Sequence, residues 1–224
     1  MKRIINLSIL LLFSAMMVTS CGNGGSKSQT DGGSTDQTTE KQSATADKKL
    51  PFEHGSYVEV TVVMGMEVSK TVYFDKWGDW TATENIMEVM GFKTHKLEIV
   101  KGKTHWDINM IEKTGTRFEL DFSGEQMTKA IADALAGKVT KGVEVKQLGE
   151  EKYLGYNCKK VLVKYPEMQM EMTVLTYGNL NMKMEGKMGK MDISTKITSI
   201  DQKAPSASIF EVPDGVKIEE EQLN

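Results

Sequence analysis

The chain has 224 residues, of which 16 are methionine and only 2 are cysteine, and its formal net charge is −3. Lysine and acidic residues are interspersed, and no basic stripe with interleaved aromatic residues occurs, so the composition argues against a nucleic-acid partner. The part of the chain after residue 49 has a length that suits one hydrophobic core rather than two.

The first twenty residues predict a secretory signal peptide. A basic start, Lys2-Arg3, precedes an apolar run from Ile4 to Val18 and the small residues Thr19-Ser20. A run this short cannot span a bilayer, which needs about 20 apolar residues. We therefore expect residues 1–20 to be absent from the mature protein.

Cys21 follows this segment directly, and Val18-Thr19-Ser20-Cys21 resembles the lipobox of bacterial lipoproteins. The resemblance implies that Cys21 is acylated, for example with palmitate, and holds the protein on a membrane without a transmembrane helix. Gly22 in place of Asp implies sorting to the outer membrane. Because no acidic cluster occupies residues 22–28, we expect the periplasmic face of that membrane.

Residues 22–49 contain no apolar side chain larger than alanine. Such a segment cannot bury enough surface to offset the entropy of ordering, so residues 21–49 predict a lipidated cysteine followed by a flexible tether. A Gly/Ser-rich coil of this length has a typical end-to-end distance of about 30 Å.

Residues 50–218 are predicted to form one α+β domain dominated by antiparallel strands, because apolar and polar residues alternate with period two. Val58, Val60, Val62 and Met64 would share one face of the first strand, and Asp75, Gly78 and Asp79 mark a turn. Further strand segments are VSKTVYF, KLEIV, HWDINMI, RFELDF, VEVKQL, NCKKVLVKY, MQMEMTVLTY, LNMKME and MDISTKITSI. We expect nine to eleven strands, followed by an acidic, solvated end at residues 219–224.

One amphipathic helix is predicted over about residues 123–137. Ser123 and Gln126 form a capping box, Met127 and Ile131 belong to the apolar stripe, and Gly137 ends the helix. We expect this helix to cover the concave side of the curved sheet.

Little in the sequence points to catalysis. His105 and Asp107 would share a strand face, but no third metal ligand can be named, and Cys158 has no evident histidine partner. Cys158 is interpreted as a small buried apolar residue. We expect a protein that is not an enzyme and that has no cofactor.

Four segments, VYFDKWGDW, LGYNCKKVLVKY, TYGNLNMKMEG and SIFEVPDGVKI, occur in this order along the chain. In this they resemble a family of uncharacterised bacterial secreted proteins and lipoproteins that is similar to the LolA/LolB lipoprotein carriers and to LppX. The resemblance implies an unclosed β-barrel, or half-barrel, with a helix in its mouth and with relatives that carry acyl chains or other apolar ligands.

Seven methionines lie between residues 165 and 193, and their alternation places several on common strand faces. The predicted ligand-binding residues are Met168, Met170, Met172, Met182, Met184 and Met191, together with Met127 and Ile131 of the helix. Three interpretations stay open: ordinary core, a cavity for an acyl chain or other apolar ligand, or a Cu(I) site at Met168, Met170 and Met172. With these go three functions: an apolar-ligand-binding lipoprotein, a periplasmic Cu(I)-binding protein, or a structural or assembly factor without a small ligand.

Overall fold

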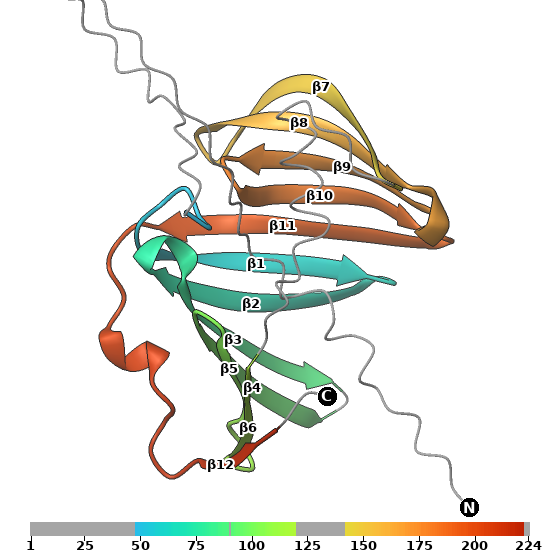
Figure 1. The fold of residues 1–224 in the computed structure, drawn as a ribbon. Coiled ribbons are helices and arrows are strands. Elements are labelled where there is room, and N and C mark those ends of the chain that lie inside the picture. The colour runs from blue at the N-terminus through green and yellow to red at the C-terminus, as the bar shows by residue number, and fades with distance from the viewer. Residues whose placement is uncertain (1–47, 90, 120–141, 222–224) are drawn as a thin grey trace, which may run out of the picture.

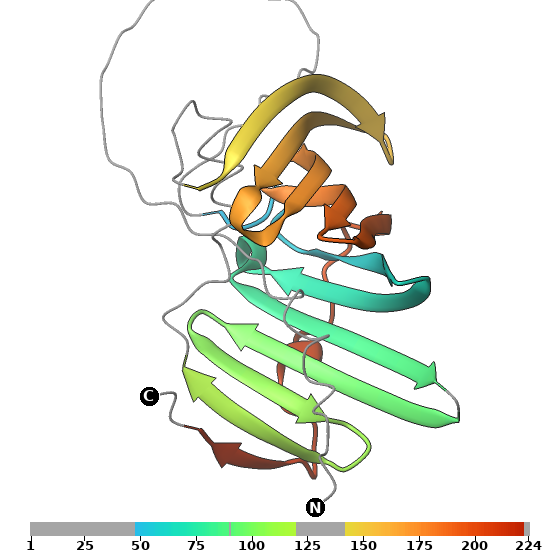
Figure 2. The same ribbon diagram turned by 90° about the vertical axis from the view of Figure 1, so that its right-hand side faces the viewer.

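The computed structural model describes residues 48–89, 91–119 and 142–221 of the chain. The described strands form a single twelve-stranded sheet in the order β12-β6-β5-β4-β3-β2-β1-β11-β10-β9-β8-β7. The sheet is curved and open, with β7 and β12 at its two edges (Figures 1 and 2). The predicted unclosed, mostly antiparallel architecture is confirmed.

Two antiparallel meanders build this sheet, and the β1–β11 pair joins them. The first consists of β1 (Gly55–Val63), β2 (Met66–Asp75), β3 (Trp80–Val89), β4 (Phe92–Lys101), β5 (Thr104–Asn109) and β6 (Thr114–Glu119). The second consists of β7 (Glu144–Tyr153), β8 (Tyr156–Tyr165), β9 (Met170–Tyr177), β10 (Leu180–Met188) and β11 (Met191–Asp201).

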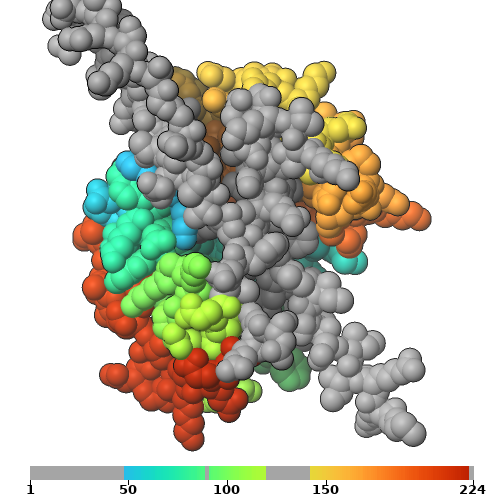
Figure 3. Space-filling model, in the orientation of Figure 1, coloured from blue at the N-terminus to red at the C-terminus, as the bar shows by residue number. Residues whose placement is uncertain are grey.

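The chain then returns to the far edge of the first meander. Residues 202–216, which we call the C-terminal strap, contain the 3-10 turn η4 (Ala207–Phe210) and lead into β12 (Lys217–Glu220). β12 pairs with β6 in parallel. Figure 3 shows these C-terminal residues, in red, lying against the green strands of the first meander.

Phe210 fixes the strap to the sheet. Its side chain is fully buried in a cluster with Ala82, Ile99 and Ile108, and its ring lies 6.1 Å from that of Trp80. The motif that contains Phe210 in the sequence thus closes the hydrophobic core over the first meander.

The chain ahead of β1 packs against the turn that joins β2 to β3. The Leu50 amide donates a hydrogen bond to the Trp77 carbonyl at 2.8 Å, and the Leu50 side chain lies against Gly78. Gly78 belongs to the turn η2 (Lys76–Gly78), whose first amide is capped by the Asp75 carboxylate at 2.7 Å. The turn predicted at this point is therefore confirmed.

Two expectations about the elements need correction. The described residues form twelve strands rather than nine to eleven, because β3 and β12 were not predicted. Met64 does not continue the face of Val58, Val60 and Val62, since it lies in the turn after β1 with a φ of 53°. Glu219 and Glu220, expected in an acidic, solvated end, are exposed and belong to β12.

The helix predicted for residues 123–137 lies outside the described residues, so it stays a prediction. Within the described ranges, the helical elements are the short 3-10 turns η2, η3 (Pro166–Met168) and η4. In those ranges, no helix has the length and apolar character needed to cross a membrane.

Candidate ligand-binding face

Three rows of side chains cross β8–β11 and the end of β1 on one side of the sheet, which we call the methionine face. Directly opposed residues of antiparallel strands share a face, so the strand register fixes the members of each row. The first row is Tyr165, Met170, Met188 and Met191; the second is Val163, Met172, Gly186, Ile193 and Val63; the third is Val161, Val174, Met184, Thr195 and Thr61. Thioether and aliphatic side chains therefore form one apolar surface.

This surface is tightly packed at its centre. Met170 and Met172 are 5% and 3% exposed and belong to one cluster with Val161, Val163 and Val174. Burying a methionine side chain of this kind contributes about 1.5–3 kcal/mol relative to leaving it in water. The methionines of β9 are thus part of the hydrophobic core of the second meander.

The other side of the same strands is charged. Lys164 and Glu171 form an ion pair at 2.9 Å, and Lys187 and Asp192 lie 3.7 Å apart in the same cross-strand row. These side chains are exposed to a large extent, so this side of β8–β11 faces water near the β10–β11 hairpin. Toward the other ends of the strands the same side is apolar and buried, because Cys158 and Leu175 belong to a second hydrophobic cluster.

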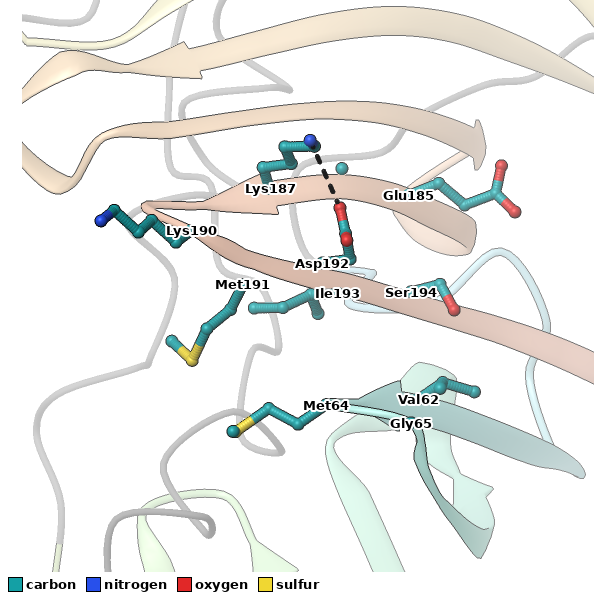
Figure 4. Close-up of a pocket in the computed structure, with 11 residues that line it drawn as sticks. Val62, Met64, Gly65, Glu185, Lys187, Lys190, Met191, Asp192, Ile193 and Ser194 are labelled. Carbon is teal, nitrogen blue, oxygen red and sulfur yellow. Dashed lines mark ion pairs between the residues drawn. The ribbon is translucent and has the colours of Figure 1, made fainter.

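An open notch of about 650 Å³ lies where the methionine face reaches the ends of the strands. It is bounded by the β1–β2 turn, with Met64, and by the β10–β11 hairpin, with Met191 and Ile193. The hairpin also contributes polar and charged lining residues from both sides of the sheet, namely Glu185, Lys187, Lys190, Asp192 and Ser194. In Figure 4, Met64, Met191 and Ile193 point to one side of β11, while Lys187 and Glu185 project elsewhere. Met64 is 71% exposed and Met191 is 37% exposed, so thioethers run from solvent into the buried rows.

The methionine face becomes polar where it continues onto the first meander. The row that starts at Val72 in β2 continues through Thr83, Glu98 and Asp107. Burial raises the pKa of the Glu98 carboxyl, and the neighbouring Asp107 carboxylate raises it further. From β3 to β5 this side of the sheet therefore offers hydrogen-bonding groups, although Tyr57, Val72 and Phe74 on β1 and β2 are buried there.

The predicted binding residues do not all meet on this face. Met170, Met172, Met184 and Met191 belong to its rows, as expected from alternation. Met182 is fully buried, but in the neighbouring cluster, at an irregularity of β10. Met127, Ile131 and Cys21 lie outside the described residues.

The prediction that Met168 alternates with Met170 and Met172 on one strand face is wrong. Met168 lies in η3, ahead of β9, and is 47% exposed. Gln169, between the turn and the strand, has a left-handed φ of 49°, which breaks the period-two pattern. The three residues considered for Cu(I) are thus divided between an exposed turn and a buried, mainly aliphatic cluster.

Two sets of residues on or beside the methionine face were not predicted from the sequence. Met188 belongs to the first row and has the same parity in β10 as Met184, so alternation could have found it. Thr176 and Asn181 are register partners whose side-chain oxygens are buried and have no hydrogen-bond partner among the described residues. No sequence signal marks these two, because their burial depends on packing between distant segments.

Cys158 and His105, the side chains considered for catalysis, are packed against other residues of the fold. The Cys158 side chain is fully buried, as predicted, and burial raises the pKa of its thiol. The His105 ring stacks on Phe118 with centroids 5.4 Å apart. Among the described residues, no group of three or more His, Cys, Asp or Glu side chains is arranged to hold a metal ion.

No protein-family model matches this chain, and no curated protein sequence does. Among solved structures, it is similar to an uncharacterized conserved protein from Thermus thermophilus, with a TM-score of 0.52 and 10% identity over 75% of this chain and 90% of that chain. This likeness shows a shared fold.

Two further similar structures are a mycobacterial protein, LprF, and a member of the LolA superfamily. LprF from Mycobacterium bovis matches with a TM-score of 0.35 and 13% identity, over 73% of this chain and 90% of LprF. A LolA superfamily protein from Nitrosomonas europaea matches with a TM-score of 0.33 and 9% identity, over 72% of this chain and 91% of that chain. The structures similar to this chain thus include a member of the LolA superfamily, which the sequence motifs resemble.

Proposed function

We propose that this chain is a non-enzymatic envelope lipoprotein whose methionine face binds an acyl chain or another apolar ligand. The observation that carries the proposal is the set of three cross-strand apolar rows, which is rich in thioethers and opens at the notch beside Met64 and Met191. Methionine side chains are flexible and polarizable, so they adapt to apolar ligands of varied shape.

The notch supplies a route for loading. One row contains Met191, Met188 and Met170. An acyl chain that contacts the exposed Met191 therefore meets further thioether side chains along this row. The contribution of Met127 and Ile131 to binding stays a prediction.

The sequence supplies the anchor for the proposed location. Acylation of Cys21 would hold the protein on the periplasmic face of the outer membrane, with residues 22–49 as tether. We expect Cys21→Ala to move the protein from the membrane fraction to the soluble fraction. Retention of this variant on membranes would contradict the lipoprotein assignment.

Native mass spectrometry of the protein purified without solvent extraction tests ligand binding directly. We expect an added mass of lipid size. Titration with an apolar fluorophore gives a second measurement, in which Met191→Lys should weaken binding because it places a charge at the mouth of the face. The matched control is Leu154→Lys, since Leu154 is also exposed but lies at the β7–β8 turn, at the opposite ends of the strands.

A protein that carries no lipid mass and binds no apolar probe would overturn the proposed function. Equal weakening by Met191→Lys and Leu154→Lys would show that the notch is not the route, because the two substitutions add the same charge at opposite ends of the sheet.

A further inference from the structure

Within the described part of the chain, two buried polar atoms without hydrogen-bond partners lie beside the methionine face. They are the Thr176 hydroxyl oxygen in β9 and the Asn181 side-chain carbonyl oxygen in β10. Thr176 is 3% exposed, and alternation along β9 puts it on the same face as Met172 and Val174. The two residues face each other in the strand register.

An irregularity of β10 brings Asn181 to this position. The register shifts between Asn181 and Lys183, so that Asn181 pairs with Thr176 and Lys183 pairs with Leu175. A bulge of this kind re-aims a side chain and is frequent next to functional sites. The unpaired residue, Met182, is fully buried beside them.

Leaving such groups without partners is unfavourable. A buried donor or acceptor without a hydrogen bond loses its hydration and gains nothing in return, and the great majority of buried polar atoms in native proteins have a partner. Two unpartnered oxygens on opposed residues, at the border of an apolar surface, therefore point to a partner that arrives with a ligand.

We infer that the ligand of the methionine face carries a hydrogen-bond donor, a hydroxyl or an amide N–H, which pairs with Asn181 and Thr176. This inference rests on the proposed function and narrows the ligand class. The Asn181 carbonyl only accepts a hydrogen bond, whereas the Thr176 hydroxyl donates and accepts. A hydroxyl or an amide satisfies both atoms, an ester or an ionised carboxylate leaves the Asn181 oxygen unpaired, and a hydrocarbon pairs with neither.

The position of the pair sets the orientation of the ligand. Thr176 lies six residues beyond Met170 in β9, about 20 Å at the ordinary rise of a strand. The polar group thus binds at the end of the face far from the notch, and the apolar body lies along Val174, Met172 and Met170.

Competition with a bound apolar fluorophore tests this inference on the full-length protein. The competitors are a long-chain alcohol, a primary amide, a methyl ester and an alkane of equal carbon number. We expect the alcohol and the amide to bind about 3- to 10-fold more tightly than the ester and the alkane, as one or two hydrogen bonds to neutral groups predict.

Two variants locate the effect. Thr176→Val and Asn181→Leu remove the two oxygens, and each should abolish most of the preference for the alcohol while alkane binding stays the same. Thr176→Val should also raise the midpoint of thermal unfolding of the ligand-free protein, because it removes a buried hydroxyl without a partner. Thr173→Val is the matched control, since Thr173 lies in the same strand on the charged side.

The possible results separate this inference from the proposed function. Failure of all four competitors to displace the probe would contradict ligand binding itself. Equal affinity for all four, tighter binding of the ester, or an unchanged preference in both variants would overturn the assignment of the polar pair while leaving an apolar site in place.

Discussion

Near the β10–β11 hairpin the buried side chains of β8–β11 lie on the methionine face, whereas the hydrophobic cluster of β3–β5 lies on the other side of the sheet. Met172 and Val174 represent the first arrangement, and Ala82, Ile99 and Ile108 the second. The side opposite each of these clusters is polar, with ion pairs such as Lys164–Glu171 in one region and the Glu98–Asp107 row in the other.

This difference between the two regions follows from the packing of the C-terminal strap on one side of the first meander. The C-terminal strap crosses the first meander and places Phe210 over Ala82, so that side of β3–β5 must be apolar. It leaves the methionine side of those strands to polar residues. The one face shared by both regions is therefore amphipathic, with apolar rows in β8–β11 and polar residues in β3–β5.

The largest effect on stability is expected from the strap. Phe210→Ala should lower the free energy of unfolding by about 3–5 kcal/mol, because it removes a fully buried aromatic ring and leaves a cavity over the first meander. Urea unfolding followed by tryptophan fluorescence measures the change, since the Trp80 ring contacts Phe210.

Phe92→Ala is the control for this substitution, since Phe92 is 79% exposed at the start of β4. We expect it to change stability by less than about 0.5 kcal/mol. Comparable losses in the two variants would mean that the strap does not hold the core of the first meander.

A smaller effect is expected from changing the sulfur atoms of the methionine face. Met170→Leu and Met172→Leu conserve volume in a buried cluster, so each should cost less than about 1.5 kcal/mol and leave apolar probe binding intact. Urea unfolding and fluorophore titration measure the two quantities. Loss of probe binding with stability retained would show that the thioethers have a specific role that packing does not explain.

The sequence predicted the apolar alternation of β9 because each side chain from Met170 to Val174 has a clear preference for core or solvent. It did not predict β3, since on one side of that strand Thr81, Thr83 and Asn85 are polar. On the other side the small Ala82 is buried only because Phe210 arrives from far along the chain. Local patterns indicate strands, but the face that becomes core depends on long-range contacts.

The same limit applies to the candidate site. Period two correctly placed Met170, Met172, Met184 and Met191, and it failed at Met168, where a backbone turn intervenes. A pattern of residues cannot reveal a left-handed φ at Gln169. Nor can it show that the oxygens of Thr176 and Asn181 are buried without partners.

The smallest effect is expected at the polar end of the shared face. The folded-state pKa of Glu98 is raised by burial and by Asp107, so ionised Glu98 destabilises the folded state. A carboxyl whose pKa is raised in the folded state stabilises folding below its unfolded-state pKa of about 4.3, and this contribution is lost as the pH rises through its folded-state pKa. Glu98→Gln should therefore be more stable than the native protein near neutral pH. At pH values where Glu98 is protonated in both states, the two proteins should have equal stability.

Urea unfolding of both proteins across this pH range measures the difference. Asp107→Asn provides the control, since it removes the neighbouring carboxylate and should reduce the gain from Glu98→Gln at neutral pH. A gain that is the same at every pH would arise from packing rather than from titration. In that case the row from Val72 to Asp107 would be polar without being electrostatically strained, and a bound polar group would gain nothing from relieving a buried charge there.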